Sequence, residues 1–152
     1  MDTNLIKQAA IFSDLDDEEV KRIAEICKEQ AFKFGQNIFK EGDPGNRLFI
    51  ISSGDVRISR VVPGSGEEAL TVLKVGACFG EMSVFDRSER STDAIANTDC
   101  TLLTITRSDF EILLDFNRDI AYKVLWRVVR LLSERLRVTN DNLRSFLAMS
   151  MF

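Results

Sequence analysis

Short apolar or β-branched runs, separated by turn-forming residues, fill the chain between residues 30 and 105. The runs include "QAFKF", "RLFIISSG", "VRISRVV", "ALTVLKVG" and "CTLLTI", and the breaks between them include "FGQN", "EGDPGN" and "PGSGEE". Short strands at this spacing are typical of antiparallel sandwiches and barrels. The sequence therefore predicts an antiparallel β jelly roll or barrel of about seven or eight strands over residues 30–105.

Helical patterns flank this β region. In "SDLDDEEVKRIAEIC", Asp16 can cap a helix and Glu19 follows three residues on, which is the spacing of a capping box. "TRSDFEILL" repeats that spacing with Thr106 and Asp109. A second C-terminal helix is predicted from about Asn117 to about Leu147.

The length of 152 residues suits one ordinary domain. We therefore expect a single, mainly β domain over residues 1–152 with flanking helices. Its parts are an N-terminal helical segment (1–29), the β-barrel (30–105) and the C-terminal helices (106–152).

The last predicted helix carries an apolar seam. Its members recur in alternating steps of four and three residues: Leu125, Val129, Leu132, Leu136, Thr139, Leu143 and Phe146. This heptad spacing is typical of helices that pair, and only Thr139 interrupts it with a polar group. The seam predicts a homodimer through this helix. Thr139 has two interpretations that do not exclude each other, a device that sets register and a ligand contact.

Composition excludes several functions. The chain has no histidine, which removes Ser-His-Asp and Cys-His catalysis and imidazole-based metal sites. Its three scattered cysteines are expected to be reduced, in a cytoplasmic protein. A net charge of −4 argues against DNA contact by this chain alone, and no apolar run is long enough for a membrane span. We expect no enzyme activity, no metal and no bound cofactor.

The segment "CFGEMSVFDRSERST", residues 78–92, gathers groups that suit a nucleotide. Gly80 permits close backbone approach, and Arg90 offers a planar fork for a phosphate. Glu81 would repel a phosphate, so it is expected to face donors such as sugar hydroxyls. The other candidate donors are the amides of Met82 and Ser83 and the hydroxyls of Ser91 and Thr92. An alternative is that Glu81 and Arg90 form only a structural salt bridge.

These motifs resemble those of the cyclic nucleotide-binding domain family, in its bacterial catabolite-activator branch. The family's phosphate-binding cassette has the form F-G-E-[LM]-[AGS], a short spacer, then R-[ST]-A. Here the corresponding segments are "FGEMS", which begins at Phe79, and "RST". "EGDPGNRLFIISSGDVRI" is similar to the family's hairpin, and Gly42, Gly54 and Gly76 fall where its turns need glycine. The resemblance covers roughly residues 10–147.

The resemblance implies a role for each matching residue. Glu81 would accept a hydrogen bond from the ribose 2′-hydroxyl, and Arg90 would bind the cyclic phosphate. The remaining implied contacts are the Ser83 amide and Ser91 on the phosphate, Ile58 and Leu70 against the purine, and Arg135, Thr139 and Asn140 near the base. Arg135 has the alternative interpretation of a solvated flank.

The expected function is therefore a regulatory sensor that binds a cyclic mononucleotide, cAMP before cGMP, and signals through the C-terminal helix. The chain departs from the family pattern at Thr92, where alanine is usual, and at the following Asp93, which strand alternation should turn outward. These departures favour an alternative, a dimeric interaction module of the same fold with a weakened or differently selective pocket. The activators' DNA-reading domain has no counterpart in the thirteen residues after Thr139, so the chain is either a stand-alone sensor or part of something larger.

Overall fold

Two four-stranded antiparallel sheets form the body of the molecule in a computed structural model that describes residues 2–151. The first sheet has the order β1 (Lys28–Phe32), β8 (Cys100–Thr106), β3 (Arg47–Ser53) and β6 (Cys78–Phe79). The second has the order β2 (Asn37–Phe39), β7 (Asp93–Ala96), β4 (Val56–Val62) and β5 (Gly66–Leu73). The predicted antiparallel β fold is confirmed.

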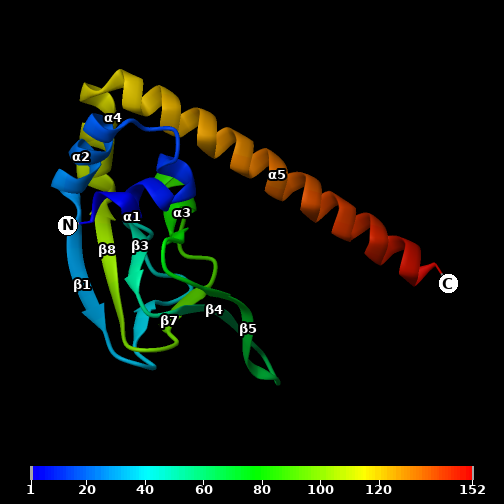
Figure 1. Ribbon diagram of the computed structural model, residues 1–152. Helices are drawn as coiled ribbons and strands as arrows, with labels where there is room; N and C mark the ends of the chain where they lie inside the picture. Colours follow the sequence, from blue (N-terminus) through cyan, green and yellow to red (C-terminus); the bar gives the residue numbers. More distant parts are fainter. Residues whose placement is uncertain (1, 152) are drawn as a thin grey trace.

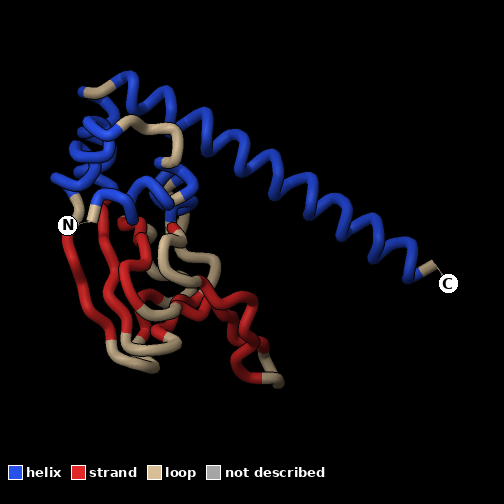
Figure 2. Tube along the Cα trace, viewed as in Figure 1, coloured by secondary structure: helices blue, strands red, loops and turns tan. Residues whose placement is uncertain are grey.

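The helices gather at one end of the two sheets, and only the last one leaves this body (Figures 1 and 2). They are α1 (Thr3–Gln8), the 3-10 helix η1 (Ala10–Phe12), α2 (Asp17–Ile26), α3 (Glu81–Asp86), α4 (Arg107–Phe116) and α5 (Arg118–Ser150). The structure thus has the flanking helices and the long C-terminal helix that the sequence predicts.

The helix starts follow from their capping residues. Asp16 accepts a hydrogen bond from the Glu19 amide at 2.9 Å, and Glu19 accepts one from the Asp16 amide at 3.0 Å. The first of these bonds lowers the pKa of Asp16. At α4 the capping box is half formed, because Thr106 accepts from the Asp109 amide at 3.2 Å without a return bond.

Strand β3 lies between two hydrophobic clusters. Its Leu48 and Ile50 pack against the helices, whereas Phe49 and Ile51 face the interior between the sheets. Because successive side chains of a strand point to opposite faces, a strand covered on both sides reads as a continuous apolar run. This explains why "RLFIISS" shows no polar alternation.

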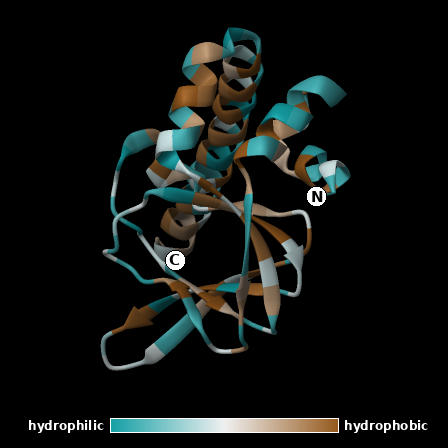
Figure 3. Cartoon of the chain, turned by 90° about the vertical axis from the view of Figure 1, so that its left-hand side faces the viewer, coloured by the Kyte–Doolittle hydropathy of each residue, from teal (hydrophilic) through white to brown (hydrophobic). Residues whose placement is uncertain are grey.

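Helix α5 has a buried half and an exposed half. Ile120, Val124 and Val128 pack into the helical cluster, but every residue from Ser133 to Met151 is exposed. Figure 1 shows this second half projecting away from the sheets, and Figure 3 shows hydrophobic and hydrophilic residues mixed along the helix. The helix ends three residues beyond the predicted Leu147.

Across residues 2–151, α5 and the other helices all fall short of the length or the apolar character that crossing a membrane requires.

Two glycines with similar φ values allow the cost of a left-handed backbone to be separated from the cost of close packing. Gly54 and Gly64 have φ values of 80° and 84°, but an added Cβ would lie 2.4 Å from the Asp99 carbonyl oxygen at Gly54 and near nothing at Gly64. We expect Gly64→Ala to lower the free energy of unfolding by about 1–2 kcal/mol, the cost of a left-handed alanine. Gly54→Ala should cost about 1–3 kcal/mol more, because it also overpacks. Equal urea midpoints for the two variants would contradict this account.

Candidate functional site

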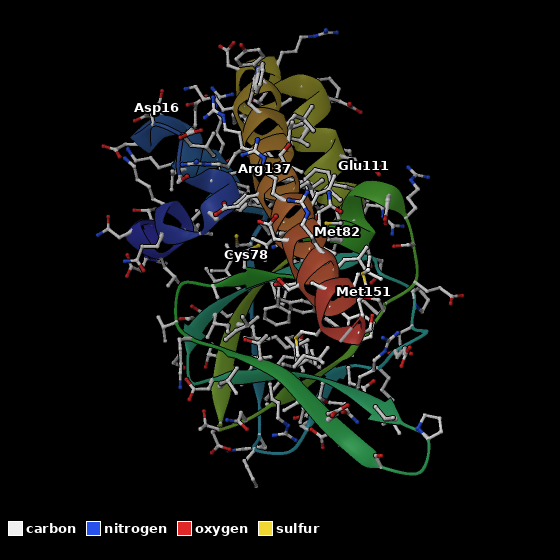
Figure 4. The ribbon with its side chains drawn as sticks, turned by 90° about the vertical axis from the view of Figure 1, so that its right-hand side faces the viewer. Asp16, Cys78, Met82, Glu111, Arg137 and Met151 are labelled. Atoms are coloured by element: carbon white, nitrogen blue, oxygen red, sulfur yellow. The ribbon has the colours of Figure 1, made fainter. Side chains whose placement is uncertain are left out.

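A hollow of about 320 Å³ lies between the segment 78–92, the β4–β5 hairpin and α5. We call it the cassette hollow. Its lining comprises Phe39, Ile58, Thr71, Leu73, Cys78, Phe79, Gly80, Glu81, Met82, Ser83, Arg90, Ser91, Thr92 and Arg135. Figure 4 labels Cys78 and Met82 in this segment and views α5 projecting toward the reader. The volume falls at the low end of the range for small-molecule sites, about 300–1,000 Å³.

The guanidinium of Arg90 is buried at the centre of this lining. The residue is 5% exposed and donates to the Gly80 carbonyl at 2.7 Å and to the Arg47 carbonyl. Its carbon Cζ stands 4.2 Å from the centroid of the Phe39 ring. These contacts hold a flat cation in one orientation against β3 and the start of α3.

This buried charge forms no ion pair within residues 2–151. No carboxylate oxygen of the described residues lies within 4.0 Å of the Arg90 guanidinium, and its Nε has no hydrogen-bond partner there. Burial, and then the neighbouring charge of Arg107, lowers the pKa of Arg90, although the more distant carboxylates of Glu81 and Asp43 act in the opposite direction. Burying an unpaired charge is costly, so an anion in the hollow would be stabilised at this point. Arg90 and Glu81 therefore do not form the structural salt bridge that the sequence allowed as an alternative.

Glu81 pairs instead with the long helix. Its Oε1 lies 3.1 Å from Nη2 of Arg135, which is 54 residues further along the chain. Glu81 is 8% exposed, whereas the Arg135 side chain is 57% exposed. Arg135 is therefore both solvated and in contact with the cassette. This ion pair connects the floor of the hollow to the start of the exposed half of α5.

Gly80 makes room for Arg90. It has a φ of 80°, in the left-handed region that glycine adopts without strain. An added Cβ would lie 2.8 Å from Nη1 of Arg90 and 3.1 Å from the Arg47 carbonyl oxygen. A side chain at this position would push the guanidinium out of place, so the cassette needs glycine here.

Arg107 fixes the other side of α3. Its Nη2 donates to the Ser83 carbonyl at 3.0 Å and to the Gly45 carbonyl. Gly45 itself lies so close that an added Cβ would be 1.9 Å from Cβ of Ser83. The turn before β3, helix α3 and the start of α4 are thus held together behind the cassette.

The structure brings most of the sequence-predicted site residues to one hollow. Those that line it are Ile58, Phe79, Gly80, Glu81, Met82, Ser83, Arg90, Ser91, Thr92 and Arg135. Three predicted residues, Leu70, Thr139 and Asn140, do not line it. Sequence reasoning missed Phe39, Thr71, Leu73 and Cys78, which do.

Local geometry explains these differences. The β4–β5 pairing shifts register between Ile58 and Ser59, so Ile58 lies opposite Thr71, and Leu70 is left 57% exposed. Counting in steps of two from Thr71 would have identified Leu73. Thr139 lies on the exposed half of α5 and donates to the Arg135 carbonyl of its own helix at 2.8 Å. Asn140, the next residue, is exposed on the same half.

Asp93 lies outside the hollow, as strand alternation predicts. Its Oδ1 accepts a hydrogen bond from the Glu41 amide at 2.7 Å, whereas the preceding residue, Thr92, lines the hollow. The carboxylate is therefore engaged with the backbone of the neighbouring loop.

The cysteines offer no reactive group to the hollow. Burial raises the pKa of Cys78, with the Glu81 charge adding to the effect, and burial raises that of Cys27 to about 12. Both thiols therefore stay protonated near neutral pH. Within residues 2–151, no three Cys, Asp or Glu side chains converge on a point that could hold a metal ion.

Arg107→Gln tests how α3 is held. The change leaves the Ser83 and Gly45 carbonyls without their donor, which costs about 1–3 kcal/mol per buried acceptor. We expect hydrogen exchange of the α3 amides to accelerate about tenfold or more. The control is Arg87→Gln, which loses only an exposed pair with Glu111. If both variants exchange alike, Arg107 does not hold the cassette.

Comparisons with known proteins agree with this geometry. The family model described as "Cyclic nucleotide-binding domain" matches residues 29–117. A CRP-like cAMP-activated global transcriptional regulator of Mycobacterium tuberculosis is 32% identical over 91% of this chain and 60% of its own length. The cyclic AMP receptor protein of Thermus thermophilus is 37% identical over 69% of this chain and 49% of its own. The chain thus spans about half to three fifths of these two relatives.

Solved structures give the same result. The N-terminal domain of a transcriptional regulator from Streptomyces coelicolor has a TM-score of 0.80 and 32% identity, over 91% of this chain and 94% of that one. The catabolite activator protein of Thermus thermophilus has a TM-score of 0.79 and 34% identity, over 88% and 61%. Because the family model covers more than half of the chain and the cassette hollow lies within the same fold, this chain belongs to the cyclic nucleotide-binding domain family.

Proposed function

We propose that this chain is a regulatory sensor that binds cAMP in the cassette hollow and signals through α5. The observation that carries the proposal is the guanidinium of Arg90, buried without a counterion beside an open hollow. A cyclic phosphate carries one negative charge. Its oxygens could accept hydrogen bonds from the N–H groups of the Arg90 guanidinium that do not bond to the Gly80 and Arg47 carbonyls. Binding would neutralise the buried cation and strengthen its hydrogen bonds.

The other groups of the hollow suit the rest of a nucleotide. Ser91 and the Ser83 amide are the proposed further donors to the phosphate. Glu81 is the proposed acceptor for the ribose 2′-hydroxyl, since among residues 2–151 its carboxylate is the one acidic group that lines the hollow. Ile58, Leu73 and Phe79 supply apolar surface for a purine. The ribose would meet Glu81 where that residue already contacts Arg135 of α5, so the ligand and the helix share a partner.

The preference for cAMP over cGMP rests on the relatives. Two curated proteins that match this chain are named for cAMP, one in Mycobacterium tuberculosis and one in Thermus thermophilus. Because this chain matches only part of each of these two relatives, we extend their cAMP binding to this chain only as a proposal. A cytoplasmic location and the lack of a catalytic step remain predictions from the sequence, which has scattered cysteines and no histidine. The alternative of a weakened or differently selective pocket now rests on Thr92 alone, which lines the hollow, because Asp93 faces the Glu41 backbone.

The exposed half of α5 supports a homodimer. Its seam residues Leu136, Leu143 and Phe146 are 61%, 55% and 66% exposed in the part of the chain that the structure describes. Two such helices packed along the heptad seam would bury these side chains. Thr139 and Asn140 lie on this half, so they would contact a nucleotide only where the dimer brings α5 over a hollow.

Arg90→Leu and Arg90→Lys test ligand binding. Truncating one partner of a buried charge pair costs about 2–5 kcal/mol, so we expect Arg90→Leu to weaken cAMP binding about thirtyfold or more. Arg90→Lys should lose less cAMP affinity, because lysine keeps the positive charge and lacks only the planar guanidinium that can donate two parallel hydrogen bonds. The measurement is isothermal titration of each variant with cAMP and cGMP, after circular dichroism has shown a native fold. Unchanged cAMP affinity in Arg90→Leu would refute the proposed phosphate site.

A charge in the seam tests the dimer. We expect Leu136→Glu with Leu143→Glu to shift the protein to monomers, because like charges would face each other across the helix pair. The control is Val138→Glu, which changes a residue that is 54% exposed but lies off the seam. Sedimentation equilibrium reports the mass. A monomeric parent, or equal masses for the seam and control variants, would contradict the proposal.

A further inference from the structure

At the helical end of the molecule, α2, α4 and the start of α5 enclose two adjoining hollows of about 600 and 460 Å³. They share Arg22, Phe116 and Asn117 as lining residues, and none of their lining residues belongs to the cassette hollow. We call the two together the α2–α4 groove. In Figure 4 its edge is marked by Asp16, at the end of the body opposite the β4–β5 hairpin.

Apolar side chains stand exposed along this groove. Phe116, at the junction of α4 and α5, is 83% exposed and lies between the two hollows. Ile112 and Tyr122 extend the apolar surface on either side and are 55% and 66% exposed. Contiguous exposed apolar surface with a polar rim is typical of a docking site for another molecule.

The rim of the groove is acidic. Six carboxylates line it, those of Asp16, Glu18, Glu19, Glu25, Asp109 and Asp119, against the three cations Arg22, Arg118 and Lys123. Lys123 bonds to Glu19, and this bond raises the pKa of Lys123, with Asp16 and Asp119 adding to the effect. The ammonium of Lys123 thus forms an ion pair with Glu19 and attracts Asp16 and Asp119 only at longer range. Glu18 pairs with Lys21 outside the groove at 3.0 Å, and the negative charge that remains in excess favours the approach of cations.

We propose that the α2–α4 groove is a docking site for a peptide segment of a partner protein that carries arginine beside apolar residues. An aliphatic side chain would fill the hollow next to Phe116, and a guanidinium would stack on the exposed ring or pair with the acidic rim. The acidic rim repels nucleic acid phosphates and anionic lipid headgroups, so neither of these fits the groove.

The test is fluorescence anisotropy of the full chain with a short labelled peptide of arginine and leucine. A matched peptide of glutamate and leucine controls for charge. We expect the arginine peptide to bind and the glutamate peptide to bind at least about tenfold more weakly. Phe116→Ser should weaken binding of the arginine peptide about tenfold or more, because it removes a central aromatic contact.

Two further variants locate the binding. Phe34→Ser removes a ring that is 71% exposed but lies in the loop after β1, away from the groove. This variant should bind the arginine peptide as tightly as the parent protein does. Glu25→Gln with Asp119→Asn should weaken binding, whereas Glu68→Gln in the β4–β5 hairpin should not. Because Phe116 is exposed, a thermal melt of Phe116→Ser should match that of the parent.

Three outcomes would overturn the proposal. The arginine peptide does not bind, or it binds Phe116→Ser and Phe34→Ser alike, or Phe116→Ser lowers the sedimentation mass of the protein. The last result would make the groove a contact between copies of this chain. The readout is independent of cAMP binding, so failure here leaves the cassette assignment standing.

Discussion

The cassette depends on a buried cation, Arg90, that forms no ion pair with any carboxylate of the described residues. Arg90 is held by the carbonyl oxygens of Gly80 and Arg47 and by the face of Phe39. Backbone carbonyls orient a guanidinium but supply only partial charges, so the position retains a strong preference for an anion. Two neighbouring features help to preserve that arrangement: Gly80, where a Cβ would collide with Arg90, and the hydrogen bond from Arg107 that holds α3. A site organised in this way, before any ligand arrives, avoids the cost of ordering its groups on binding.

The second constraint is the length of α5. Its first half completes the helical cluster, whereas its second half leaves the body with apolar side chains exposed. The Glu81–Arg135 pair sits just beyond the boundary between these halves and is the point at which the helix contacts the cassette. A ribose hydroxyl on Glu81 would compete with or reorganise this contact. A ligand can shift the arrangement of α5 only by binding one arrangement better than another, and this pair is where such a difference would arise.

Much of this architecture was predictable from local patterns. The short strands, the capping box at Asp16 and the heptad seam are periodic or short-range signals, and the structure contains the corresponding elements. The cassette motif identified eight of the lining residues, and the rest of the family resemblance added Ile58 and Arg135. The misplacement of Leu70 arose from the register shift in the β4–β5 pairing, which no local pattern announces. The partner of Glu81 and the carbonyl partners of Arg90 are contacts between distant segments, and periodicity carries no information about them. The α2–α4 groove likewise forms only when α2 packs beside the α4–α5 junction.

We propose above all that a cyclic phosphate in the cassette hollow supplies the negative charge that balances the Arg90 cation. The most direct test is a crystal structure of the protein grown with cAMP. The account predicts a phosphate oxygen within hydrogen-bonding distance of the Arg90 guanidinium, with the ribose 2′-hydroxyl on the Glu81 carboxylate. A phosphate placed away from Arg90, or a cassette hollow that stays empty at saturating cAMP, would contradict it.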